Sequence, residues 1–99
     1  MDIERHLKET LRWRILQALD AGRPYAISED VILTAVSGDD MPITHRDLRR
    51  EMDYLEDRKL LKVNGKGTAR WTAELTHYGV DVVEYTVECF PGIARPPKY

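Results

Sequence analysis

Only one of the 99 residues is a cysteine, Cys89, so the chain cannot close an intramolecular disulfide. No group of Cys and His residues has the spacing of a metal site, and we expect no metal or other cofactor. The apolar runs fall far short of the roughly 18 residues that a membrane span needs, and the N-terminus is charged from its second residue. We therefore expect a protein of a reducing compartment, the cytoplasm, with no membrane partner.

The residue patterns of enzyme active sites are also scarce. His6, His45 and His77 are far apart along the chain, and Cys89 has no histidine near it in sequence. No paired carboxylates and no phosphate-binding loop stand out. The glycines at 65 and 67 lie between two predicted strands, which indicates a turn. We expect no catalytic residues, and no small-molecule ligand is evident.

Positive charge is present but unevenly distributed. The whole chain carries a net charge of −2, which by itself argues mildly against a nucleic-acid partner. Residues 1–43 are net −3 and residues 72–99 are net −2, whereas residues 44–71 hold eight Lys and Arg and are net +3. The hydrophobic fraction of 42% is ordinary for a folded domain. The basic segment therefore lies within a single small globular domain.

The first predicted helix covers residues 3–21. Its apolar stripe consists of Leu7, Leu11, Ile15, Ala18 and Leu19, and Gly22 and Pro24 end it. Trp13 falls roughly opposite the centre of that stripe, so it needs a cover. Two covers remain open: the C-terminal segment of the same chain, or a second copy in a homodimer.

Two further helices follow. Ser28 is a good N-cap for a helix that ends near Ser37. Thr44 caps the next helix, with Asp47 placed to reach back to the cap. Its buried face holds Leu48, Met52 and Leu55; its outer face holds Arg46, Arg49 and Arg50 in the first half and Asp53 and Asp57 in the second. Only the first half is therefore basic on its outer side.

A hairpin completes the basic segment. Residues 60–64 and 69–75 read as two strands around a glycine turn, with Trp71 and Leu75 facing the core. Lys62, Lys66 and Arg70 are placed to line this wing. Thr76 then caps a fourth helix through Tyr85.

The chain divides into a domain at residues 1–86 and a proline-rich tail at residues 87–99. Three prolines and a glycine predict a tail that is extended or partly disordered. Phe90 and Ile93 are apolar enough to lie on the domain. Together with Trp13 they are the candidate contacts to a second copy or another protein.

The order of helix, helix, helix, strand, wing, strand and helix resembles the winged helix-turn-helix superfamily of DNA-binding proteins. LEDRKLL at residues 55–61 resembles the end of the recognition helix in many such regulators. Leu75, Thr76 and Gly79 resemble the start of the last helix in MarR-type and PadR-type regulators. A narrower similarity is to small winged-helix proteins of Mu-like prophages, on LRWRILQALD and PGIARP. The resemblance implies an α+β fold with a three-helix core, a two-stranded β-wing and a C-terminal helix.

It also implies a transcription regulator that binds double-stranded DNA and forms a homodimer. The major-groove candidates lie at the start of the third helix: Thr44, His45, Arg46, Arg49 and Arg50. The backbone candidates lie on the wing: Lys62, Lys66 and Arg70. Arginines 12, 14 and 23 are weaker phosphate candidates.

Two observations favour a different function. Asp53, Glu56 and Asp57 would repel phosphate, which restricts any groove contact to the first half of the helix. Arg49 and Asp53 are i, i+4 neighbours, and a charged helix face is often only a solvated one. The alternative is therefore a protein-interaction or assembly module that does not bind DNA.

Overall fold

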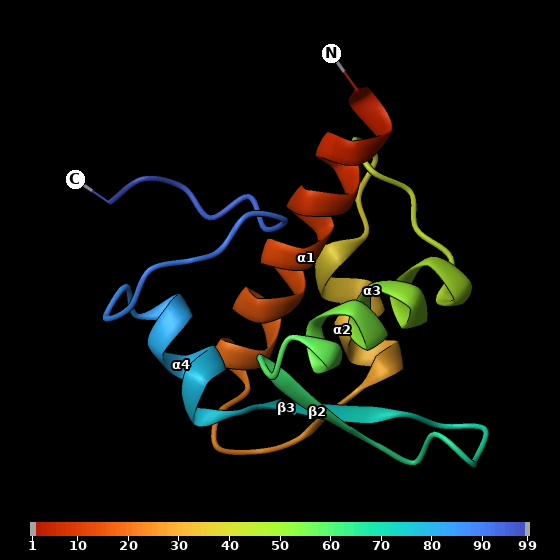
Figure 1. The fold of residues 1–99 in the computed structure, drawn as a ribbon. Helices are drawn as coiled ribbons and strands as arrows, with labels where there is room; N and C mark the ends of the chain where they lie inside the picture. The colour runs from red at the N-terminus through yellow and green to blue at the C-terminus, as the bar shows by residue number, and fades with distance from the viewer. Residues whose placement is uncertain (1, 99) are drawn as a thin grey trace.

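The computed structural model describes residues 2–98. Helix α1 (Ile3–Ala21) begins at Asp2, whose carboxylate accepts a hydrogen bond from the Arg5 amide at 3.1 Å, and it ends at Gly22. These bounds are the predicted ones. In Figure 1, α1 runs through the middle of the molecule, with α2 and α3 on one side and α4 and the C-terminal segment on the other. This central position brings neighbours to two sides of the helix.

The next two helices form the helix-turn-helix. Helix α2 (Glu29–Val36) is capped by the Ser28 hydroxyl, and helix α3 (His45–Asp57) is capped by Thr44, as the sequence predicts. The link between them is tightened by paired backbone hydrogen bonds between Gly38 and Met41. Leu48, Met52 and Leu55 turn inward from α3 and are fully buried.

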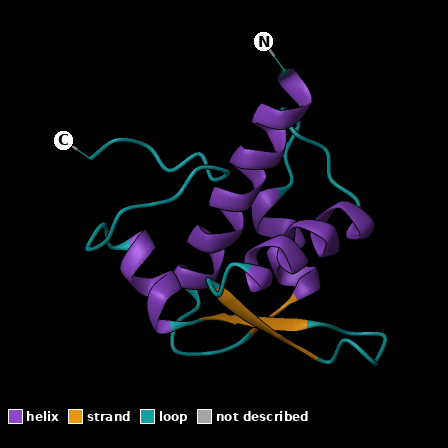
Figure 2. Cartoon of the chain, viewed as in Figure 1, coloured by secondary structure: helices purple, strands orange, loops and turns teal. Residues whose placement is uncertain are grey.

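The wing is part of a three-stranded sheet. Strands β2 (Leu61–Asn64) and β3 (Thr72–Leu75) pair antiparallel, and the short strand β1 (Ile27–Ser28) pairs with the other edge of β3. Figure 2 shows the sheet beneath the helices. The prediction of two strands was incomplete, because two residues are too few to show a strand pattern. Strand β1 ties the start of α2 to the base of the wing.

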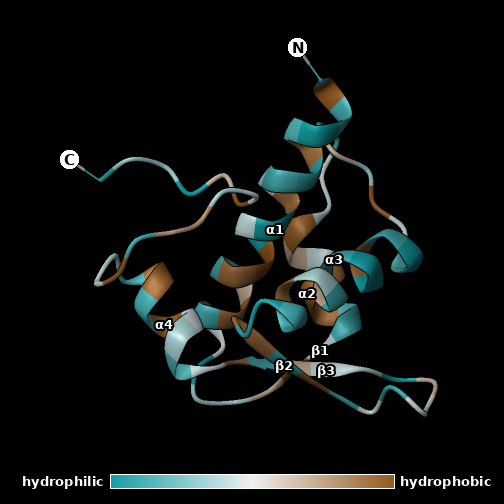
Figure 3. Cartoon of the chain, in the orientation of Figure 1, coloured by the Kyte–Doolittle hydropathy of each residue, from teal (hydrophilic) through white to brown (hydrophobic). Residues whose placement is uncertain are grey.

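The core lies between α1, α2, α3 and the inner face of the sheet. Its fully buried members include Ile15, Leu16, Ile32, Met52 and Leu61. In Figure 3 the ribbon of α1 alternates between hydrophilic and hydrophobic colours from turn to turn, as an amphipathic helix should. Val63 and Ala73 face each other across the sheet and close the core from below.

Helix α4 (His77–Val83) packs closely on the end of α3. Gly79 is buried, and a Cβ there would collide with the carbonyl oxygen of Leu60. The predicted helix extended to Tyr85, but the observed one ends two residues earlier. Tyr85 has a φ of +63°, a left-handed conformation that stops the helix.

Of the two covers left open for Trp13, the structure shows the one from its own chain. Its side chain is only 7% exposed, and its ring meets the Tyr85 ring edge to face with centroids 6.2 Å apart. The helical-wheel argument assumed one buried face, whereas α1 is covered on two sides. Trp13 thus packs within its own chain, and it is not available as a contact to a second copy.

The segment after α4 lies on the domain. Arg12 donates to the Gly92 carbonyl at 2.8 Å, and the Ala94 amide donates to the Glu9 carbonyl at 3.1 Å. Arg95 donates to the carbonyls of Val82 and Val87, both at 2.9 Å. These bonds hold residues 86–98 along α1 and α4 without a regular helix or strand.

Candidate nucleic-acid interface

The start of α3 carries a complete capping box. The Thr44 hydroxyl accepts from the Asp47 amide, and the Asp47 carboxylate accepts from the Thr44 amide, each at 3.1 Å. The bond from the Thr44 amide lowers the pKa of Asp47. The capping box uses the amides of Thr44 and Asp47, and within residues 2–98 the amides of His45 and Arg46 have no acceptor, so they are left for an outside one.

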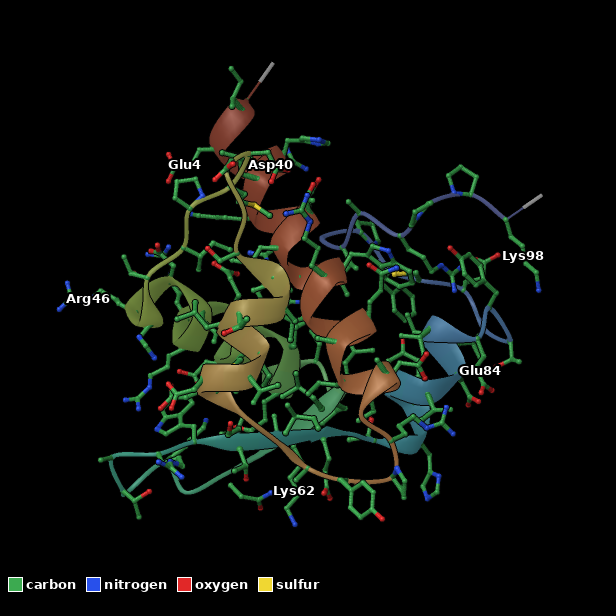
Figure 4. All side chains as sticks on the ribbon, turned by 180° about the vertical axis from the view of Figure 1, so that it is seen from behind. Glu4, Asp40, Arg46, Lys62, Glu84 and Lys98 are labelled. Atoms are coloured by element: carbon green, nitrogen blue, oxygen red, sulfur yellow. The ribbon has the colours of Figure 1, made fainter. Side chains whose placement is uncertain are left out.

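Among the arginines predicted to contact DNA, Arg46 is the one most available to a ligand. It is exposed, and within residues 2–98 its side chain forms no hydrogen bond or ion pair. Figure 4 shows it projecting outward from the start of α3. His45 beside it contacts the Asp30 carboxylate of α2 through Nε2 at 2.9 Å, with both side chains more than half exposed.

Arg49 instead forms hydrogen bonds that hold parts of the fold together. Its Nε and Nη2 donate to the two carboxylate oxygens of Glu29 at 2.7 and 2.5 Å, and Nη2 also donates to the Ala69 carbonyl at 3.0 Å. Its guanidinium lies 4.6 Å from the centroid of the Trp71 ring. Arg49 therefore joins α3 to α2 and to the wing, and we call this group the Arg49 clamp.

Glu29 is the buried half of the clamp. Its side chain is only 4% exposed, and besides Arg49 it accepts a hydrogen bond from the Trp71 amide at 3.3 Å. The bonds from Arg49 and then from that amide lower the pKa of Glu29. An acidic residue in the first turn of α2 suits the helix dipole, but this position alone does not mark Glu29 as the partner of Arg49. No short sequence motif could reveal the pair, because 20 residues separate Glu29 from Arg49.

Arg50 is only partly engaged. It lies 3.3 Å from Asp47 and 3.3 Å from Glu51, and its side chain is 57% exposed. Glu51 is buried at 2% and has a second partner in Arg12, whose Nε donates to it at 2.8 Å. Sequence reasoning missed this buried pair.

The three weaker phosphate candidates also form ion pairs with carboxylates. Arg12 pairs with Glu51, Arg14 with Asp40, and Arg23 with Asp20 and Glu84.

The wing lysine folds back onto α3. Lys66 Nζ lies 2.6 Å from Asp53 and 2.5 Å from Glu56, and hydrogen bonds to these two carboxylates raise its pKa. Glu56 also accepts from the Val63 amide at 2.7 Å. Asp53 and Glu56, which the sequence suggested would repel phosphate, thus have a cation beside them. They fix the wing against the second half of α3.

The other two wing cations are exposed and lie apart. Arg70 is exposed and follows Ala69, whose carbonyl accepts a hydrogen bond from Arg49, so its backbone lies next to the Arg49 clamp. Lys62 lies opposite Glu74 in the sheet register, on the outer face of β2. Figure 4 shows Lys62 and Arg46 projecting in different directions.

The turn of the wing has a defined shape. Gly65 has a φ of +82°, and a Cβ there would lie 2.5 Å from the Arg70 carbonyl oxygen. The Thr68 hydroxyl donates to the Gly65 carbonyl at 2.7 Å, and the Arg70 amide donates to that hydroxyl at 3.3 Å. These bonds place Arg70 at the end of an ordered turn.

Arg46 lies in the turn of α3 before Arg49, and the backbone of Arg70 follows the Ala69 carbonyl that accepts from Arg49. With Thr44, His45 and Arg50 they form a basic surface, called here the α3–wing surface. Within residues 2–98, no three His, Cys, Asp or Glu side chains gather closely enough to hold a metal ion. No helix in the same range has the length and hydropathy to cross a bilayer.

Comparison with known proteins supports the fold. No protein-family model matches the chain, and no curated protein sequence matches it. Among solved structures, the chain is similar to Bordetella bronchiseptica BpsR, a protein whose DNA binding is regulated by 6-hydroxynicotinic acid. The TM-score is 0.61 at 25% identity, over 77% of this chain and 50% of the BpsR chain. The chain therefore has an α+β winged-helix fold, and it matches half the length of BpsR.

Proposed function

We propose that this chain is a DNA-binding transcription regulator that meets the duplex with its α3–wing surface. Free backbone amides at the start of α3 and the exposed Arg46 beside them carry this proposal. A helix N-terminus favours an anionic oxygen, and an arginine there suits a guanine edge or a phosphate. The DNA binding of BpsR, at 25% identity, supports the same function for this chain.

The Arg49 clamp gives the surface its rigidity. It holds α3 and the wing in a fixed relation before any ligand arrives, so less ordering is needed on binding. In this proposal Arg46, Arg50 and Arg70 contact DNA, with Thr44 and His45 beside them. Arg49 and Lys66 act as positioning residues because their charged groups already have partners.

Lys62 does not belong to the α3–wing surface, because it lies on the outer face of the sheet opposite Glu74. Its contribution is expected to be small. A prophage origin stays a prediction from the resemblance at LRWRILQALD and PGIARP.

A fluorescence-anisotropy titration with a mixed-sequence duplex at two salt concentrations tests the proposal. Binding should weaken as salt rises, because each neutralised phosphate contributes a slope of about −0.9 in log K against log salt. The Arg46→Ala and Arg70→Ala variants should each weaken binding by roughly tenfold, as loss of an arginine contact does. Arg5→Ala removes the same charge from a 75% exposed site on α1 and should change little.

The second candidate is a protein-interaction module. Several basic residues of the segment 44–71 are paired within the chain, notably Arg49 and Lys66, and this leaves less positive charge than the sequence suggests. If the duplex does not bind at low salt, or if salt leaves the affinity unchanged, this second function replaces the first. Equal losses for Arg46→Ala and Arg5→Ala would show that binding is not localised at α3.

A further inference from the structure

The C-terminal tail meets α1 and α3 at Gly92. The Gly92 carbonyl accepts a hydrogen bond from Arg12 Nη1 at 2.8 Å, and two residues on the Ala94 amide donates to the Glu9 carbonyl at 3.1 Å. Gly92 has a φ of +111°, which favours glycine, and a Cβ there would collide with the Tyr54 hydroxyl. In Figure 1 the tail lies beside α1. The tail therefore has a defined position against Arg12.

Three contacts hold the Arg12 side chain in place. Besides the bond to Gly92, its Nε donates to the Glu51 carboxylate at 2.8 Å, and its guanidinium lies 3.5 Å from the centroid of the Tyr54 ring. The Arg12 side chain is 13% exposed and the Glu51 side chain only 2%. A buried carboxylate needs a cation beside it, because it has lost its hydration. Arg12, bonded to the tail, supplies that cation.

The Tyr54 ring also contacts a second guanidinium. The guanidinium of Arg58 lies 3.6 Å from the ring centroid, so two cations stack on opposite faces of one ring. Arg58 in turn lines an apolar cavity of about 490 Å³, whose walls include Phe90, Pro91 and Ile93 of the tail. The same tail segment thus lines this cavity and bonds to Arg12 through the carbonyl of Gly92.

Glu51 has a second partner on the α3–wing surface. Its other carboxylate oxygen accepts from Arg50 Nε at 3.3 Å, a longer bond than the one from Arg12, and Arg50 also lies 3.3 Å from Asp47. The Arg50 side chain is 57% exposed. Because Arg12 already neutralises Glu51, Arg50 can turn outward without leaving a buried charge unpaired. The freedom of Arg50 therefore depends on Arg12.

We propose that Arg12, held by the tail, is a positioning residue that keeps Arg50 available for DNA. Within residues 2–98, Arg12 and Arg50 are the only cations paired with Glu51. When Arg12 is removed or displaced, Arg50 becomes the remaining partner of a buried carboxylate, and its guanidinium is withdrawn from the α3–wing surface. Arg12 has this role only if Arg50 contacts the duplex, so the inference rests on the proposed function.

Anisotropy titrations of the full chain with the mixed-sequence duplex measure the effect on binding. Arg12→Met should weaken binding roughly tenfold and reduce the salt slope by about 0.9, the share of one phosphate contact. Arg50→Ala should cause a similar loss in the wild-type chain and little further loss in the Arg12→Met chain. Arg5→Met removes the same charge from an exposed site on α1 and should change little.

Neutralising Glu51 separates positioning from a loss of folding. With Glu51→Gln no buried charge draws Arg50 inward, so the double variant of Arg12→Met and Glu51→Gln should bind within about threefold of the wild type. A purely structural role predicts instead that the double variant binds no better than Arg12→Met. Circular dichroism should show each variant folded.

A change in the tail tests its part without altering any charge. Gly92→Ala should push the Gly92 carbonyl away from Arg12 and weaken duplex binding, though less than Arg12→Met does. Phe90→Ala is the matched control in the same segment: its side chain is 71% exposed, and its removal should leave binding unchanged. Equal affinities for Gly92→Ala and the wild type would overturn the role given to the tail.

A second measurement needs no DNA. In an NMR spectrum of arginine Nε–H groups, with the Arg50 signal assigned through Arg50→Lys, its exchange with water should be slower in Arg12→Met than in the wild type. An unchanged Arg50 signal, or additive losses for Arg12→Met and Arg50→Ala, would overturn the inference and leave the proposed function standing. If the wild-type chain binds no duplex at low salt, the proposed function fails, and the Arg50 signal still decides whether Arg12 positions Arg50.

Discussion

Replacing Glu29 should destabilise the whole domain, because Glu29 is the buried centre of the Arg49 clamp. The Glu29 carboxylate accepts two hydrogen bonds from Arg49 and one from the Trp71 amide, and its side chain is only 4% exposed. Glu29→Ala removes all three bonds and leaves a guanidinium and a buried amide without their acceptor. The residues affected belong to α2, α3 and the wing.

The size of the effect follows from burial. Removing one partner of a buried ion pair costs about 3–5 kcal/mol, mostly from the charge left behind. Arg49 keeps 34% of its side chain exposed, so it can turn toward water and recover part of this loss. We therefore expect the lower end, about 3 kcal/mol for Glu29→Ala.

Urea unfolding followed by circular dichroism measures this change. With a slope of about 1.5–2 kcal/mol per molar urea for a chain of this size, the midpoint should fall by about 1.5–2 M. Glu4→Gln removes a carboxylate from the exposed pair with Lys8 and should move the midpoint by less than about 0.3 M.

A double-mutant cycle isolates the pair itself. Glu29→Gln and Arg49→Met should each destabilise, and the double variant should be less destabilised than the sum by about 1.5 kcal/mol or more. Losses that add within about 0.5 kcal/mol would mean that the two side chains do not interact. That result would refute the clamp and the positioning role given to Arg49.

Two other expectations follow from single residues. Because the folded pKa of Glu29 is lowered, its stabilisation is fully present above the ordinary value of 4.5 and is lost as pH falls through the folded pKa. Between pH 6 and pH 3 the free energy of unfolding should therefore fall more for the wild type than for Glu29→Gln. Parallel curves of this free energy against pH would contradict the prediction. Gly79→Ala should destabilise by about 2 kcal/mol through its clash with Leu60, whereas Gly67→Ala, which meets no atom within 4 Å, should stay within about 0.5 kcal/mol in urea unfolding.

The sequence predicted the elements whose signals are local. Thr44 and Asp47 are three residues apart, so the capping box can be read without knowing the fold, and the start of α3 was placed correctly. The glycine turn and the alternating Leu61 to Asn64 likewise predicted the hairpin. In each case neighbours along the chain carry the information.

The errors came from contacts between distant segments. Arg49 and Lys66 counted as free cations in the sequence, and the fold pairs them with Glu29, Asp53 and Glu56. Trp13 was expected to need a cover, but nothing in a helical wheel reports that Tyr85 is the residue that returns to cover it. A charge count therefore overestimates the positive charge that a folded surface offers.

Chemical-shift mapping by NMR tests the central claim most directly, since it locates the contact as well as detecting it. We expect a mixed-sequence duplex to shift the amides of His45, Arg46, Arg50 and Arg70, with little change at the tail or at Lys62. Shifts at these positions that shrink as salt is added would agree with the proposed interface. Shifts confined to the cavity around Phe90 or to the outer face of the sheet, or no shifts at low salt, would contradict it.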